Sequence, residues 1–163
     1  MQILDDLQRL TSSQGALLYR LVDLGYLTKG QVDELINQLV GDRLAKAERY
    51  LTFAQQLDAN ARLDQPHIIS RCYYAMYHAT RALVLQVRRA DLDDHDRLPA
   101  ALDQIVGSNY GDILARWRGM RNQVEYSPYA PVDLADQAAT ALIDARSLLT
   151  ACGGFLQNRG VEL

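Results

Sequence analysis

The chain has 163 residues, of which 48% are hydrophobic and 23% are charged, a balance that supports a folded core and excludes wholesale disorder. No apolar run approaches the ~18 residues of a membrane span, and the N-terminus carries acids where a secretion signal needs a basic start. We therefore expect a cytoplasmic protein of one domain, alone or with an extension, and its formal net charge of -3 does not itself indicate a nucleic-acid-binding protein.

The first part of the chain carries short amphipathic patterns. Apolar residues at helical spacing predict helices at about 2–10 and 15–24, and Gly25 is typical of a helix end. The sequence Thr28–Gln31, "TKGQ", has the spacing of a capping box and begins a further apolar pattern. We interpret residues 1–41 as a helical extension of the main domain.

The remaining chain predicts an all-α fold. Four longer helices are expected at about 42–63, 66–89, 111–126 and 132–157, with a short one at about 99–106. Pro66 suits a first helical turn, Asp133 can cap the last helix, and no stretch alternates in the manner of a strand. We predict that residues 42–157 form an up-down bundle of four main helices, and that 158–163 form a tail.

The cysteines and histidines do not predict a metal site. Cys72 and Cys152 lie in apolar helical patterns without CxxC spacing, so we predict buried, reduced thiols. The histidines make no metal-ligand spacing with the cysteines, and the motifs GxxxxGK[ST], GxGxxG and HExxH do not occur. The acidic run at 91–96 could attract a cation, but such a run is usually a solvated loop. We therefore expect no metal and no cofactor.

Arginine dominates the basic residues and forms a row on the second long helix. The chain has 15 arginines and two lysines, which together make its 17 basic residues. Arginine favours bidentate contacts to phosphate, although a genome rich in arginine codons would produce the same bias. Residues three, four and three positions apart share one side of the helix at Arg71, Tyr74, His78 and Arg81. This row could bind phosphates and stack a base, or it could pair with acids such as Asp58 or Glu48.

The third long helix ends in a second polar group. Arg118, Asn122 and Glu125 lie away from its apolar stripe, and Arg121 lies at the boundary of that stripe. An adjacent Arg and Asn could hold a phosphodiester, but RNA cleavage also needs an acid or base, usually His. A solvated ladder on an exposed helix face is the alternative interpretation.

Three stretches of the sequence resemble the HEPN domain family. "SRCYYAMYHATRALV" at Ser70–Val84 is similar to the first signature helix of the family, a Tyr-Tyr-Ala-x-x-His/Phe-Ala-like run. "RWRGMRNQVEYSPY" at Arg116–Tyr129 is similar to the second, an Arg near a helix end followed by a polar stretch and an aromatic residue. "ADQAATALIDARSLLTAC" resembles the closing helix, so the resemblance covers about residues 42–157.

The resemblance implies a fold, an activity and partners. HEPN domains are bundles of four or five helices that commonly dimerise, and many are metal-independent ribonucleases, including toxins paired with small nucleotidyltransferase antitoxins. It therefore implies a homodimer, a nucleotidyltransferase partner and an RNA or nucleotide ligand. The catalytic pattern of the family is an Arg, usually followed by a polar residue, and a His after four to six intervening residues. Two copies of this motif meet across the dimer.

This sequence departs from the catalytic pattern. Arg121 with Asn122 matches its start, but Tyr126 occupies the shortest allowed position of the histidine, and no histidine follows His95. A neutral tyrosine, with a pKa near ~10, is a poor general base at pH 7. Arg121 and Tyr126 are the catalytic candidates that remain. Because some partners in the family add AMP to a tyrosine after the motif, Tyr126 and Tyr129 are candidates for modification.

We therefore expect a HEPN-type protein that binds RNA or nucleotide in a toxin–antitoxin or defence system, with its nuclease activity weak or lost. The binding candidates are Arg71, Tyr74, His78, Arg81, Arg118, Arg121 and Asn122. One alternative is an active metal-independent ribonuclease that uses a non-standard base. Another is a non-catalytic dimeric partner or regulator of a nucleotidyltransferase.

Overall fold

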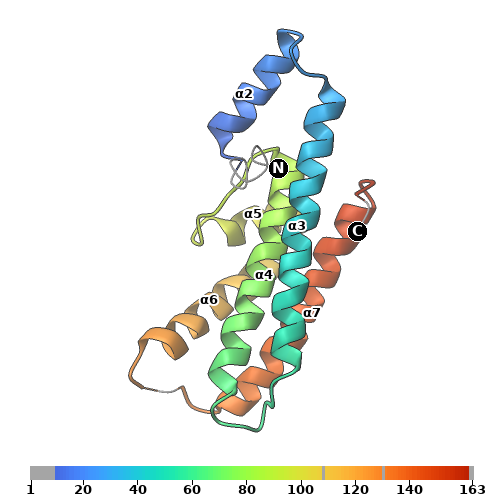
Figure 1. The fold of residues 1–163 in the computed structure, drawn as a ribbon. Helices are drawn as coiled ribbons and strands as arrows, with labels where there is room; N and C mark the ends of the chain where they lie inside the picture. The colour runs from blue at the N-terminus through green and yellow to red at the C-terminus, as the bar shows by residue number, and fades with distance from the viewer. Residues whose placement is uncertain (1–9, 108, 130, 162–163) are drawn as a thin grey trace.

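The computed structural model describes residues 10–107, 109–129 and 131–161, and these residues are all-helical, with no strand among them (Figure 1). The helices are α2 (Ser12–Asp23), α3 (Lys29–Gln55), α4 (Gln65–Arg88), α5 (Leu98–Val106), α6 (Tyr110–Tyr126) and α7 (Leu134–Gln157). The all-α class is confirmed, but the described chain has six helices rather than four main ones. The helix predicted at 2–10 lies almost entirely outside the described residues.

The first two described helices begin at capping boxes. Thr11 and Gln14 cap α2, which therefore begins earlier than the predicted residue 15. Thr28 and Gln31 cap α3 as predicted, with each side chain bonded to the backbone of the other residue. Gly25 follows the end of α2 in the left-handed conformation, at φ 76°, which glycine adopts without steric strain.

Helix α3 is longer at its start and shorter at its end than predicted. It continues through the expected boundary between residues 41 and 42, because a buried stripe at Ile36, Val40 and Leu44 spans that point. A glycine inside a helix costs only ~1 kcal/mol, so this burial outweighs the cost of Gly41. The helix ends at Gln55 instead of residue 63, where the connection to α4 folds into its own turns.

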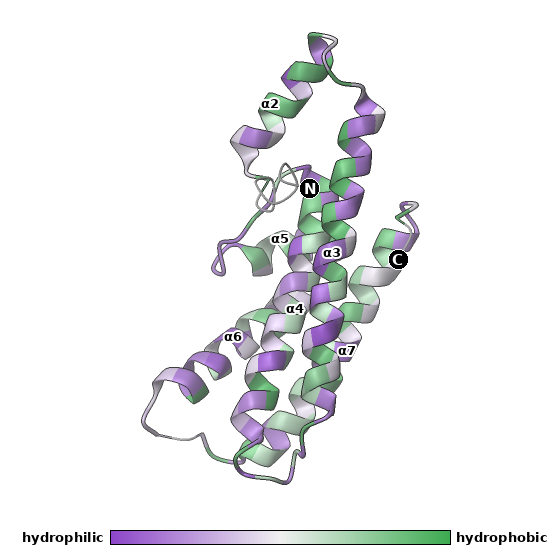
Figure 2. Cartoon of the chain, in the orientation of Figure 1, coloured by the Kyte–Doolittle hydropathy of each residue, from purple (hydrophilic) through white to green (hydrophobic). Residues whose placement is uncertain are grey.

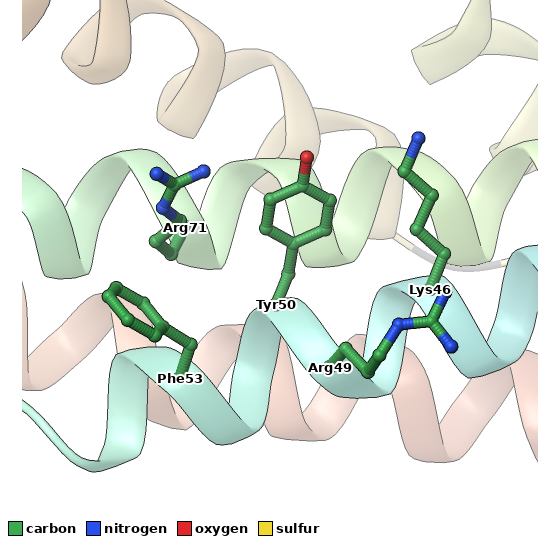
Figure 3. A pocket seen from close by; sticks show the side chains of 5 residues that line it. All are labelled: Lys46, Arg49, Tyr50, Phe53 and Arg71. Carbon is green, nitrogen blue, oxygen red and sulfur yellow. The ribbon is translucent and has the colours of Figure 1, made fainter.

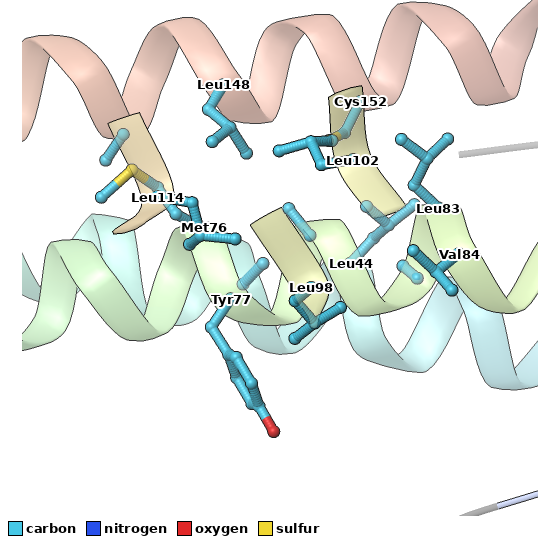
Figure 4. Close-up of a cluster of buried hydrophobic side chains, with 14 of the residues drawn as sticks. Leu44, Met76, Tyr77, Leu83, Val84, Leu98, Leu102, Leu114, Leu148 and Cys152 are labelled. Carbon is cyan, nitrogen blue, oxygen red and sulfur yellow. The ribbon is translucent and has the colours of Figure 1, made fainter. Parts of the chain in front are cut away.

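Helix α4 lies at the centre of the fold, and all the described helices except α2 pack against it. The other predicted helices, at 66–89, 99–106, 111–126 and 132–157, correspond to α4, α5, α6 and α7 to within two residues at each end. Figure 4 shows side chains from α4, α5, α6 and α7 meeting in one core, with Met76 and Leu148 among them. Pro66 lies in the first turn of α4 as predicted.

The two cysteines are free and buried in this core, as predicted. Burial raises the pKa of both the Cys72 and the Cys152 thiols to about 12, so both stay protonated at neutral pH.

The start of α7 differs from the prediction in one detail. Asp133 occupies the N-cap position, but its side chain makes no capping hydrogen bond. Its backbone is left-handed, at φ 56°, a conformation that Asp tolerates better than most residues. Asp133 therefore turns the chain into α7 through its backbone and does not cap the helix with its carboxylate.

The helices leave one side of α4 open to polar side chains. Helices α3 and α7 lie along α4, and α6 packs on α4 without packing on α3 (Figure 1). Figure 2 shows hydrophilic residues along both α3 and α6. No helix in the described part of the chain is both long enough and apolar enough to cross a membrane. The polar row predicted on α4 lies between α3 and α6.

Candidate functional site

Arginine side chains alternate with aromatic rings across α3, α4 and α6. The Arg71 guanidinium carbon lies 5.5 Å from the ring centroids of both Tyr50 and Phe53. The Tyr50 ring stacks on the Tyr74 ring with 5.6 Å between centroids. Arg121 in turn lies 5.1 Å from the Tyr74 ring. We name this set the arginine–aromatic row, which comprises Phe53, Arg71, Tyr50, Tyr74, Arg121 and Tyr126.

Arg121 joins α6 to α4 within this row. Its Nη2 donates to the hydroxyl of Tyr74 at 2.7 Å, and its Nη1 donates to the side-chain oxygen of Asn122 at 2.8 Å and to the hydroxyl of Tyr126 at 3.4 Å. Its Nε lies 3.3 Å from a carboxylate oxygen of Glu125, at ion-pair distance but without hydrogen-bond geometry. The structure thus gathers three predicted residues, Tyr74, Asn122 and Tyr126, around the guanidinium group of a fourth, Arg121.

A histidine that sequence reasoning did not select lies next to this cluster. His95, in the connection between α4 and α5, shares a hydrogen bond between its Nδ1 and the hydroxyl of Tyr73. Its ring stacks on Tyr77 with 4.2 Å between centroids. Tyr73 also lies beneath Arg121, whose guanidinium carbon is 5.4 Å from the Tyr73 ring. Tyr73 therefore links His95 to Arg121, although 26 positions separate the two residues in the sequence.

The surroundings of His95 keep its imidazole neutral. Burial lowers its pKa below the ordinary histidine value, and the positive charges of Arg118, Arg121 and Arg81 lower it further. Burial also raises the pKa of Tyr73, despite the opposing charges of Arg121 and Arg118, so that its phenol stays protonated. A neutral imidazole and a neutral phenol beside guanidinium groups are suited to proton transfer near a phosphate.

The connection that carries His95 binds two arginines predicted to bind RNA. The buried carboxylate of Asp91 accepts from Arg43 Nη2 at 2.8 Å and from Arg81 Nε at 3.1 Å. Asp96 accepts from Arg118. Arg81 and Arg118 are therefore engaged by carboxylates of residues 91–96. The alternative interpretation of the sequence paired the row with acids such as Asp58 or Glu48, whereas the acid that pairs with Arg81 is Asp91.

His78 points to α3, and within the described residues no hydrogen bond or ring contact joins it to Arg121. Its buried ring stacks on Tyr50 with 5.6 Å between centroids and meets the edge of Tyr77 at 5.2 Å. Burial, with the nearby charges of Lys46 and Arg81, lowers its pKa to about 3. His78 is therefore a neutral ring that packs against the face of Tyr50.

A pocket of about 330 Å³ lies at the α3 end of the arginine–aromatic row (Figure 3). It is lined by Lys46, Arg49, Tyr50, Phe53 and Arg71. No residue lining it is acidic, and its three cations form no hydrogen bond or ion pair with other described residues. Lys46 and Arg49 were not singled out in the sequence, because neither belongs to a recognised motif.

The two tyrosines considered for modification are both exposed. Tyr126 is 72% exposed at the end of α6, and Tyr129 is 82% exposed in the connection to α7. Tyr126 accepts a long hydrogen bond from Arg121, while the backbone N–H of Tyr129 donates to Ser127 Oγ at 3.2 Å. Both phenols are open to solvent, and only that of Tyr126 belongs to the Arg121 cluster.

The site combines guanidinium groups, aromatic rings and two neutral imidazoles where α3, α4 and α6 meet the connection before α5. Guanidinium groups bind phosphate oxygens, and aromatic rings stack bases. No protein-family model and no curated protein sequence matches this chain. The grounds for a functional proposal are therefore this geometry and the resemblance of the two signature stretches.

Proposed function

We propose that this protein binds RNA or nucleotides through the arginine–aromatic row, as a HEPN-type protein of a toxin–antitoxin or defence system. The supporting observation is the alternation of Arg71 and Arg121 with aromatic rings from three helices. A single strand that crosses such a row can place phosphates on the guanidinium groups and bases on the rings, and every base has a face that can stack.

The same proposal covers the architecture and the partners. Helices α3, α4, α6 and α7 would form the four-helix up-down bundle of a HEPN domain, with α2 and α5 as additions. The protein would act in the cytoplasm as a homodimer, with a small nucleotidyltransferase as its partner. Its nuclease activity would be weak or absent, because Tyr126 replaces the histidine of the family motif.

The binding proposal is tested with a fluorescent single-stranded RNA of about 16 nucleotides, which is long enough for an open groove. Fluorescence anisotropy should show binding that weakens as salt is added. The double variant Arg71→Ala/Arg121→Ala should bind at least about tenfold more weakly, because two charge-assisted contacts are lost. Its plot of log affinity against log salt should also be flatter by about 1.4, at about 0.7 for each phosphate contact removed.

A matched control removes two exposed arginines elsewhere. Arg20 lies on α2 and Arg146 on α7, and the change Arg20→Ala/Arg146→Ala alters the net charge by the same amount. This control variant should bind the RNA with an affinity within about twofold of the wild type, since its arginine–aromatic row is intact. Undetectable binding by the wild-type protein, or binding that salt does not weaken, would refute the proposal.

A second candidate function is metal-independent RNA cleavage, which the position of His95 favours. In the tautomer whose Nδ1–H donates to the Tyr73 hydroxyl, His95 has a free lone pair on Nε2. In the proposed reaction Nε2 takes the proton of a ribose 2′-hydroxyl, whose oxygen bonds to the adjacent phosphorus. The bond from phosphorus to the 5′-oxygen breaks, that oxygen takes a proton from water, and a 2′,3′-cyclic phosphate remains. The protonated His95 then returns its proton to the hydroxide that is left. Arg121 stabilises the charge on the phosphoryl oxygens.

The cleavage candidate is tested by incubating a labelled RNA with the protein in the presence of EDTA. His95→Ala and Arg121→Ala should each reduce cleavage by at least about 100-fold, the usual contribution of an acid–base or charge-stabilising group. The exposed His67 provides the control, and His67→Ala should cleave like the wild type. Cleavage that persists in His95→Ala, or its absence in the wild type, eliminates this candidate and leaves the binding proposal intact.

A further inference from the structure

We infer that the pocket between α3 and α4 is a subsite for one nucleoside phosphate, with the phosphate held by Lys46, Arg49 and Arg71 and the base stacked on Phe53. This inference rests on the proposed RNA or nucleotide binding and makes it more specific. It assigns a role to two residues of α3, Lys46 and Arg49, that no sequence pattern selected.

The arrangement of the lining side chains fits the two parts of such a ligand. Lys46, Arg49, Tyr50 and Phe53 are three, one and three residues apart on α3, so they share one side of the helix. In Figure 3 Tyr50 stands between a group formed by Arg71 with Phe53 and a group formed by Lys46 with Arg49. Positive charge therefore lies on both sides of an aromatic ring, within one pocket.

The pocket lacks the counter-ions that other arginines of the protein have. Asp91 pairs with Arg43 and Arg81, and Asp96 pairs with Arg118. No carboxylate lines the pocket, and within the described residues Lys46, Arg49 and Arg71 have no ion-pair partner. Three like charges on one small surface repel one another, and a bound phosphate relieves that repulsion.

Arg71 remains available for an anion although it stacks on two rings. The cation–π contacts with Tyr50 and Phe53 use the face of the guanidinium group. Its N–H donors point outward along the edge of the plane, in the fork that matches two phosphate oxygens. Phe53 is 47% exposed, so part of its ring remains open to a base.

A neighbouring pocket supports binding of a strand as well as of a single nucleotide. It has a volume of about 400 Å³ and shares Lys46 and Arg49 with the first pocket. Arg43, His78 and Arg81 also line it, together with Asp42 and Leu39. A phosphate at Lys46 and Arg49 would thus lie between two cavities, and a strand could continue from one to the other.

The phosphate part of the inference is tested with the change Lys46→Ala/Arg49→Ala. Both side chains are exposed, so the core should be unaffected and the unfolding temperature should stay near that of the wild type. We expect binding of the labelled RNA strand to weaken by at least about tenfold. The control Arg20→Ala/Arg146→Ala should remain within about twofold of the wild type.

The base part is tested with Phe53→Ala and with small competitors of the labelled strand. Phe53→Ala should weaken binding by about fivefold or more, the loss of one stacked base, whereas Phe53→Tyr should not. AMP should displace the strand better than adenosine or ribose 5-phosphate, because only AMP has both the base and the phosphate. If AMP displaces the strand no better than ribose 5-phosphate does, the base does not contribute to binding and the base part of the inference is wrong.

The outcomes separate this inference from the proposed function. If the wild type binds no RNA strand and no AMP, the proposed function fails and the subsite fails with it. If the wild type binds RNA but Lys46→Ala/Arg49→Ala behaves like the control, the function stands and the subsite assignment is wrong. The assignment is also wrong if Phe53→Ala and Phe53→Tyr bind with equal affinity to the wild type.

Discussion

Asp91 provides the strongest test of how the connection between α4 and α5 is held. Its side chain is 3% exposed and pairs with two guanidinium groups, those of Arg43 and Arg81, which are 10% and 13% exposed. Asp91→Ala would remove this carboxylate from two guanidinium groups that are themselves nearly buried. Breaking a buried ion pair in this way costs about 3–5 kcal/mol in the free energy of unfolding. In a chain of this length that corresponds to a fall of about 6–20 °C in Tm.

The contribution of Asp91 to the free energy of unfolding should decrease at acidic pH. Burial opposes ionisation, but hydrogen bonds and charges from Arg43 and Arg81 outweigh it and hold the pKa of Asp91 below its ordinary value. Its stabilising contribution is therefore complete above the unfolded pKa of about 3.9 and is lost as the pH falls through the lower folded pKa. The stability difference between wild type and Asp91→Ala should be constant near pH 7 and should narrow below about pH 4.

The assay is urea unfolding followed by circular dichroism, at pH 7 and at several acidic values. Glu48 lies exposed on α3, so Glu48→Ala provides a control that should change the free energy of unfolding by less than about 0.5 kcal/mol. Asp91→Asn should fall between the control and Asp91→Ala, because it keeps the shape of the side chain without its charge. A cost of less than about 1 kcal/mol for Asp91→Ala would show that this carboxylate does not hold the connection.

Two further changes test local features of the helices by the same unfolding assay. Thr28→Ala removes the capping box that Thr28 forms with Gln31, and it should destabilise the protein by about 1 kcal/mol, whereas Thr28→Ser should be nearly neutral. Gly111→Ala places a Cβ 2.5 Å from the carbonyl oxygen of Pro99 and against Asp103, so it should cost about 1–3 kcal/mol. An unchanged unfolding midpoint in Thr28→Ala would show that the capping box does not stabilise α3. An unchanged midpoint in Gly111→Ala would contradict the close contacts of Gly111 with Pro99 and Asp103.

Local signals in the sequence predicted the helices well. Features that depend on contacts between distant parts of the chain could not be predicted in this way. The capping box at Thr28 and the left-handed Gly25 depend on residues a few positions apart, so spacing alone revealed them. The helix start predicted at about residue 42 was wrong because the burial of Val40 and Leu44 maintains the helix through Gly41. That burial depends on α4, which no local pattern describes.

The same limit applies to the candidate site. Sequence spacing placed Arg71 and Tyr74 on one side of α4, and the structure places both in the arginine–aromatic row. The spacing could not show that Tyr50 of α3 joins them, because that contact crosses between helices. His95 was passed over because it lies in a polar connection, and only the fold brings it against Tyr73.

The central position of α4 has a consequence for the order in which the chain folds. Helices α3 and α4 are neighbours in sequence and share the most extensive interface among the described helices, so they can pair after closing only the connection at 56–64. Helix α7 packs on this pair from much further along the chain. Changes at the α3–α4 interface should therefore slow folding, whereas changes at the α4–α7 interface should mainly speed unfolding.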